Sequence, residues 1–200
     1  MNYRAALILI AAMLAGCATS YDYYKLKTEV PLTAFQVQQS VGLIPADIPG
    51  WLNDARLSWS DGEVKVFRAE NDRWGTDLGQ EVDRTLSENL SQQLGGAAVT
   101  IGPWFGDQRP DLAVKVDLDN LVMVDKVVEV TARWKLLNKK GKILVQSDEQ
   151  VIWIAETESQ EQSLRLALGI SQALAGMSAD IVEAVRNVAA TKLTDKKMEP

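Results

Sequence analysis

The sequence contains no histidine, and its single cysteine is Cys17. Histidine is the commonest general base and the commonest metal ligand in proteins, so its absence removes the usual partner of a nucleophilic serine. One cysteine cannot form an internal disulfide, so the chain has to fold by packing alone. We interpret the chain as a protein that is not an enzyme and whose side chains hold no cofactor and no metal.

Positive charge is also scarce. The chain has 21 Lys and Arg residues against 27 Asp and Glu residues, for a net charge of −6. Nucleic-acid binding depends on neutralising phosphates with basic side chains, so this balance argues against a nucleic-acid partner. It argues equally against a basic surface for anionic lipid headgroups.

Long apolar runs are missing, and the apolar stretch that opens the chain is short. Arg4 supplies one positive charge, and residues 5–13 are then uniformly apolar. A membrane-spanning helix needs about 20 apolar residues to cross a hydrocarbon core of about 30 Å. A charged head, a short apolar core and small residues are instead typical of an export signal. We predict a signal peptide over residues 1–16.

The segment Leu14-Ala15-Gly16-Cys17 closes this stretch and resembles the lipobox of bacterial lipoproteins. The resemblance implies a covalent diacylglycerol on the Cys17 thiol, cleavage before that residue and an N-acyl chain on the new amino terminus. Several acyl chains together hold a protein on a membrane stably. Ala18 follows in place of an aspartate, which in such lipoproteins implies the outer membrane, with the domain facing the periplasm. The alternative is a free cysteine after an ordinary signal peptide.

The lipid anchor is predicted to lie close to the folded part of the chain. Residues 17–22 form the lipidated terminus and a short spacer, in which three or four linker residues reach about 10–15 Å. Tyr23 and Tyr24 follow at once, and they either pack into the domain or lie at the membrane surface. We expect one domain over residues 23–190, which is long enough to bury a core, and a flexible polar tail over residues 191–200.

Hydrophobic periodicity predicts the elements of this domain. Alternation of apolar and polar residues indicates strands over residues 33–44, 56–59, 63–67, 98–101, 112–118, 128–136 and 143–154. The Asp61-Gly62 turn joins the second and third of these strands into a hairpin. The last three strands form an antiparallel meander.

Two stretches show helical periodicity. Leucine or valine recurs every fourth residue over residues 77–94, for which Thr76 is a plausible N-cap and Gly95-Gly96 the stop. Residues 159–188 carry a second apolar face, which Gly169 and Gly176 weaken by about 1 kcal/mol each. The expected fold is α/β or α+β: a single domain with a mixed, mostly antiparallel sheet packed with two amphipathic helices.

Charged residues offer two candidate sites. Asp117 and Asp119 point the same way on one strand, but a calcium site needs six to eight oxygen ligands, and we favour a solvated strand face. Lys139, Lys140 and Lys142 form a basic turn, which we interpret as a contribution to solubility.

Trp104-Phe105 lies in a loop rich in proline and glycine. Because loops run over protein surfaces, this pair is a candidate contact with a partner or a membrane, together with Tyr23 and Tyr24. The alternative is that the loop folds back over the core as a plug.

Three features in this order resemble one family. Tyr23-Tyr24-Lys25-Leu26 follows the lipobox, a proline-marked loop spans residues 45–52, and Arg73-Trp74-Gly75 precedes the first helix, which continues through residues 85–91. This arrangement is similar to the ABC-type transport auxiliary lipoproteins of the PqiC kind, over nearly the whole mature chain. The resemblance also implies a domain similar to the N-terminal type of domain in TolB-like periplasmic proteins.

The resemblance implies a non-catalytic role in intermembrane lipid transport. The expected partners are an inner-membrane-anchored MCE-domain protein, the outer-membrane bilayer and further copies of the chain in a homo-oligomer. The alternative is an outer-membrane lipoprotein that regulates a peptidoglycan synthase, which would need a long linker after the cysteine. A lipid-modifying enzyme is a third reading, disfavoured by the missing histidine.

Overall fold

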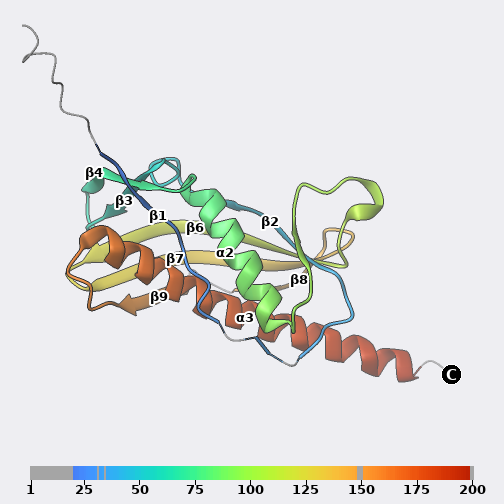
Figure 1. The fold of residues 1–200 in the computed structure, drawn as a ribbon. Helices are drawn as coiled ribbons and strands as arrows, with labels where there is room; N and C mark the ends of the chain where they lie inside the picture. Colours follow the sequence, from blue (N-terminus) through green and yellow to red (C-terminus); the bar gives the residue numbers. More distant parts are fainter. Residues whose placement is uncertain (1–19, 31, 34, 148–150, 199–200) are drawn as a thin grey trace, which may run out of the picture.

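Two long antiparallel strands form the centre of the domain in the computed structural model, which describes residues 20–30, 32–33, 35–147 and 151–198 (Figure 1). β6 (Leu112–Val124) and β7 (Val127–Asn138) pair along their whole length. The turn between them holds Asp125 at a φ of 52°. The regular apolar alternation of both strands buries one face of this pair, as the sequence predicts.

Each long strand carries two shorter strands along its outer edge. β2 (Val41–Asp47) and β3 (Arg56–Ser60) both run parallel to β6. β8 (Ile143–Gln146) and β9 (Val151–Glu156) run antiparallel to β7. The sheet is therefore mixed, with its antiparallel meander where the sequence predicted one.

Further strands extend the β6 side of the sheet. β5 (Val99–Ile101) pairs in parallel with β2, and β4 (Val66–Trp74) pairs antiparallel with β3. β1 (Asp22–Tyr24) pairs in parallel with β4. The start of the described chain is thus fixed to the sheet by backbone hydrogen bonds.

Both helices cover the same face of this sheet (Figure 1). α2 (Leu78–Gln93) lies over β2 and β5, α3 (Gln162–Met198) lies over β7 and β9, and the two helices contact each other. The apolar residues at every fourth position of α2 are fully buried: Leu78, Val82, Leu86, Leu90 and Leu94. The domain therefore has two layers, which confirms the expected single α/β domain.

The strand boundaries correct the sequence prediction at several points, and β6 runs to Val124, six residues past its expected end. Residues 35–40 are not a strand, and β2 begins only at Val41, where β5 and β6 are both available to pair. β4 is longer than predicted and begins at Val66, because Asp61 accepts backbone hydrogen bonds from Glu63 and Lys65 in a wider turn. The strand expected over 143–154 is divided into β8 and β9, which lie along the same edge of β7.

The helix ends differ from the prediction as well. Asp77 is the N-cap of α2, and its side chain accepts from the backbone N–H of Gln80 at 2.9 Å, so the assignment of Thr76 was wrong. Gly95 and Gly96 both adopt positive φ and end the helix, as predicted. α3 continues to Met198, ten residues past its expected end, so the helix covers most of the expected tail.

Gly169 lets α3 approach the sheet closely. A Cβ atom at this position would lie 2.4 Å from Cβ of Val128 in β7, which is closer than real Cβ contacts. The glycine that weakens the helix in isolation is therefore required where the helix crosses β7.

Candidate functional site

The predicted lipid anchor lies outside the described residues. Cys17 and the lipobox residues Leu14, Ala15 and Gly16 all precede Ser20, where the described chain begins. Four residues lie between Cys17 and Asp22, the first residue of β1, so five residue steps join the two. At no more than about 3.6 Å per step, these five steps span at most about 18 Å, so a group carried by Cys17 would lie near β1.

The structure gives the two tyrosines at this end different surroundings. The Tyr24 hydroxyl donates a hydrogen bond to the Glu161 carboxylate just before α3, which raises the pKa of Tyr24 above its usual value, with a smaller contribution from burial. Tyr23 is 69% exposed. The Tyr24 side chain thus belongs to the domain, and Tyr23 is the one available for a surface contact.

The segment after β1, which we call the strap (residues 25–30 and 32–33), lies across the two helices (Figure 1). The backbone N–H of Leu26 donates to Glu81 at 3.0 Å, and that of Lys27 donates to Ser171 at 3.0 Å. The N–H of Thr33 donates to the carbonyl of Gln92 at 2.9 Å. The chain that leads from the predicted anchor is therefore fixed to both helices by polar contacts.

Glu81 holds the strap because it is itself paired. It is 5% exposed and lies 2.8 Å from the Arg84 guanidinium, which also donates to the carbonyl of Leu26 at 2.6 Å. A buried carboxylate needs such compensation. The pair therefore couples α2 directly to the strap.

A row of buried polar side chains continues along α2 from Glu81. Thr85 and Asn89 are fully buried and Gln93 nearly so. Four of their side-chain atoms have no hydrogen-bond partner within the described chain: Thr85 Oγ1, Asn89 Oδ1 and Nδ2, and Gln93 Nε2. This row is not among the predicted sites, although its four polar residues recur at every fourth position between the leucines. Such groups are rare in folded proteins, and each one left unsatisfied costs free energy.

Trp104 and Phe105, which both lie in the β5–β6 loop, have different surroundings. The Trp104 ring packs on the backbone of Gly42 in β2, and its Nε1 donates to the Thr100 hydroxyl at 3.0 Å. Phe105 is 75% exposed. Trp104 therefore folds back on the sheet face opposite the helices and not over the core as the expected plug, and Phe105 remains at the surface.

The candidate contact residues do not form one site. β1, with Tyr23 and Tyr24, lies on the side of the domain that carries β3 and β4, whereas the β5–β6 loop lies at the opposite end (Figure 1). The β7–β8 turn and the end of α3 share this second end, which we call the distal end. The domain therefore has one surface close to the predicted anchor and another far from it.

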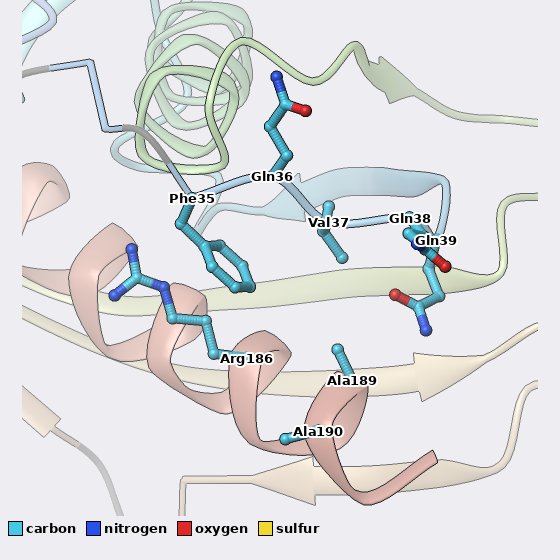
Figure 2. A pocket seen from close by; sticks show the side chains of 8 residues that line it. All are labelled: Phe35, Gln36, Val37, Gln38, Gln39, Arg186, Ala189 and Ala190. Carbon is cyan, nitrogen blue, oxygen red and sulfur yellow. The ribbon is translucent and has the colours of Figure 1, made fainter. Parts of the chain in front are cut away.

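A cleft at the distal end lies between residues 35–39 and residues 186–190 of α3 (Figure 2). The Arg186 guanidinium lies 4.6 Å from the centre of the Phe35 ring, and Ala189 lines the cleft from the helix. Its volume is about 200 Å³. Pockets for drug-sized ligands span about 300–1,000 Å³, so this cleft fits a partner side chain better than a lipid.

The paired aspartates of β6 are part of a charged sheet surface. Asp117 lies 3.1 Å from the Lys115 ammonium, and Asp119 lies 2.7 Å from the Arg133 guanidinium. The pairing with Asp119 raises the pKa of Arg133. This arrangement agrees with the solvated strand face that the sequence favoured.

Known proteins resemble this chain over most of its length. A family model described as "ABC-type transport auxiliary lipoprotein component" matches residues 24–182. The chain is 32% identical over 145 residues to the intermembrane transport lipoprotein PqiC of Escherichia coli, which covers 69% of this chain and 76% of that protein. The same lipoprotein of Shigella flexneri matches equally well.

Two crystal structures share the fold. An uncharacterized protein has a TM-score of 0.64 and 22% identity, covering 83% of this chain and 99% of its own. A protein of Xanthomonas campestris has a TM-score of 0.65 and 12% identity, covering 88% and 99%. No helix among the described residues is long and apolar enough to cross a membrane.

Proposed function

This chain belongs to the family of ABC-type transport auxiliary lipoprotein components, and on that premise we propose that it docks a periplasmic lipid-transport channel to the outer membrane. In this proposal, Cys17 carries diacylglycerol and an N-acyl chain, and the domain faces the periplasm. The channel is formed by an inner-membrane-anchored MCE-domain protein, which contacts the distal end. The name of the relative from Escherichia coli, an intermembrane transport lipoprotein, supports this role.

The observation that carries the proposal is the separation of the two ends. The spacer reaches at most about 18 Å from Cys17 to β1. α3 has 37 residues and is about 55 Å long at 1.5 Å per residue, and it runs along the domain to the distal end (Figure 1). A short anchor at one end and an exposed aromatic residue at the other suit an adaptor between a bilayer and a periplasmic protein.

The membrane half of the proposal depends on Cys17. Acyl chains add about 0.8 kcal/mol for each buried methylene, so chains on one residue suffice for a stable anchor. The Cys17→Ala variant should lose lipid labelling and either remain uncleaved or become soluble. An unchanged outer-membrane fraction for this variant would contradict the lipid anchor.

The partner half is tested by crosslinking in cells. A photoreactive phenylalanine analogue in place of Phe105 should form an adduct with the MCE-domain protein. The same analogue at Val64, which is 96% exposed in the β3–β4 turn, is the matched control and should not. An adduct with a peptidoglycan synthase instead would favour the alternative role as its regulator.

The free sheet edge supports a homo-oligomer. Ile152 and Ile154 of β9 are 53% and 66% exposed, and no described strand pairs with the outer edge of β9. An unpaired edge with apolar side chains favours pairing with another chain. Size measurement of the lipid-free chain should give more than one copy, and Ile154→Lys should shift it to the monomer.

A further inference from the structure

Four cations from two loops meet at the distal end. Lys139, Lys140 and Lys142 lie in the β7–β8 turn, and Arg109 lies at the end of the β5–β6 loop. A Cβ atom at Gly141 would lie 3.4 Å from the Arg109 guanidinium, so the arginine rests against the lysine turn. All four side chains are exposed. We call these four residues the basic cluster.

The backbone of the turn holds the lysines in place. The Asn138 side chain accepts from the N–H groups of Lys140 and Lys142 at 2.9 and 3.0 Å. The N–H of Gly141 donates to the carbonyl of Asn138 at 2.8 Å, and Gly141 has a φ of 81°. The turn therefore depends on backbone groups and Asn138, which leaves the lysine side chains available to a partner.

The charge of the basic cluster is not neutralised by ion pairs within the described part of the chain. Two carboxylates lie near it. Asp107 is exposed on the same loop as Arg109, and Asp111 accepts from both the N–H and the hydroxyl of Ser40 at 3.1 and 2.9 Å. In a chain with a net charge of −6, four cations gathered at one end, with no ion pair to any described residue, run against the overall composition.

We propose that the basic cluster, with Phe105 at its margin, docks a carboxylate-rich surface of a periplasmic protein. Arginine and lysine pair with carboxylates, and an exposed aromatic ring beside them supplies the apolar contact typical of interface hot spots. The cluster lies at the end away from β1, so it faces away from the membrane that the spacer keeps near β1 (Figure 1). The inference rests on the proposed function for the identity of the partner, the MCE-domain protein, but not for the chemistry of the surface.

The test uses the mature chain with Cys17→Ser, so that it is soluble, and three probes. These are the periplasmic part of the MCE-domain protein, a deca-glutamate peptide, and vesicles of phosphatidylethanolamine with phosphatidylglycerol. Binding is measured from about 50 to about 300 mM NaCl, because exposed charges are increasingly screened over this range. The test variant is Arg109→Glu/Lys139→Glu/Lys140→Glu. The control, Lys25→Glu/Lys27→Glu/Arg68→Glu, changes the net charge equally at exposed positions away from the distal end.

We expect the MCE-domain protein to bind with an affinity that falls with salt, and the test variant to bind about tenfold more weakly while the control variant is unaffected. Equal losses in both variants, or no loss in either, would overturn the proposal. Binding of the cluster to vesicles but to neither protein probe would also overturn it. Cluster-dependent binding of deca-glutamate without binding of the MCE-domain protein would support the basic cluster and count against the proposed partner.

Discussion

The Trp104 ring lies directly on the backbone of Gly42. A Cβ atom at Gly42 would lie 2.4 Å from Cζ2 of Trp104 and 2.7 Å from Cγ of Pro110. Val41 and Leu43, its neighbours in β2, are buried in the core beneath the helices, so Gly42 points to the other face of the sheet. This contact fixes the β5–β6 loop, and with it Phe105 and Arg109, at the distal end.

Gly42→Ala should therefore destabilise the domain. The added methyl group has to displace the tryptophan ring or the proline, and overpacking of this kind costs about 1–3 kcal/mol. Urea unfolding followed by tryptophan fluorescence measures the change. Gly50→Ala is the control, because no atom lies within 4 Å of its added Cβ, and it should stay within about 0.5 kcal/mol of the parent. Equal effects at the two glycines would contradict the contact.

Gly169→Ala should also destabilise, although alanine favours a helix by about 1 kcal/mol over glycine. The added methyl group meets Cβ of Val128 at 2.4 Å, so α3 has to move away from β7. The free energy of unfolding should fall in spite of the gain in helix propensity. Gln172→Ala, at an exposed position of the same helix, should leave it nearly unchanged. Stabilisation by Gly169→Ala would show that helix propensity outweighs the close packing.

The parts of the fold that the sequence could predict are those that depend on local patterns, whereas these glycine and loop contacts join distant segments. The meander of β6, β7 and β9 follows from alternation within each strand, which is a local property. Residues 35–40 have similar residue types, yet they form no strand, because pairing depends on a partner elsewhere in the chain. The presence of two strands, β8 and β9, where one was expected likewise depends on the register of each with β7.

The candidate sites also depend on contacts between distant segments. The sequence predicts Trp104 and Phe105 as a pair, and only the position of Gly42 in the folded chain shows that Trp104 packs on the sheet while Phe105 does not. The lysine turn was interpreted as solubility because Arg109 lies 30 residues earlier and joins it only in the folded chain. Contacts between distant loops leave no periodic signal.

Asn89→Leu should stabilise the domain. Both polar atoms of the Asn89 side chain are buried without a partner in the described chain, and leaving such a group unsatisfied costs about 1–3 kcal/mol. Leucine has a similar size and matches the neighbouring apolar stripe of α2. Thermal or urea unfolding should show a gain of about 1–2 kcal/mol, whereas Asn187→Leu at an exposed position of α3 should show almost none. A loss of stability at Asn89 would indicate that a water molecule or a ligand satisfies the side chain.

Asp83 should make stability depend on pH. Burial raises the pKa of Asp83, against a hydrogen bond from the backbone N–H of Ala46 at 2.8 Å, which lowers it. A carboxyl whose pKa is raised on folding contributes stability below its unfolded value of about 3.9, and this contribution is lost as the pH rises through the folded value. Asp83→Asn keeps an acceptor for Ala46 and has no charge to bury.

The variant should therefore gain stability relative to the parent as the pH rises from about 3 to about 7. The difference between the two proteins is the quantity to measure, because other carboxyls such as Asp54 have a lowered pKa and act in the opposite direction. A difference that is constant over this range would show that the Asp83 pKa is not raised.

Trp104→Ala and Phe105→Ala should have different consequences for stability, although the residues are neighbours. Trp104 covers Gly42 and donates a hydrogen bond to Thr100, so its truncation should lower the free energy of unfolding by about 2–4 kcal/mol. Phe105 is 75% exposed, so its truncation should change stability by less than about 0.5 kcal/mol. If Phe105 is the apolar margin of the docking surface, its loss should still weaken binding of the MCE-domain protein about tenfold, as expected for an aromatic hot spot. Chemical unfolding and the binding assay, applied to both variants, distinguish a residue that stabilises the loop from a residue that contacts the partner. A Phe105→Ala variant that binds normally would remove Phe105 from the interface and leave the basic cluster to carry it alone.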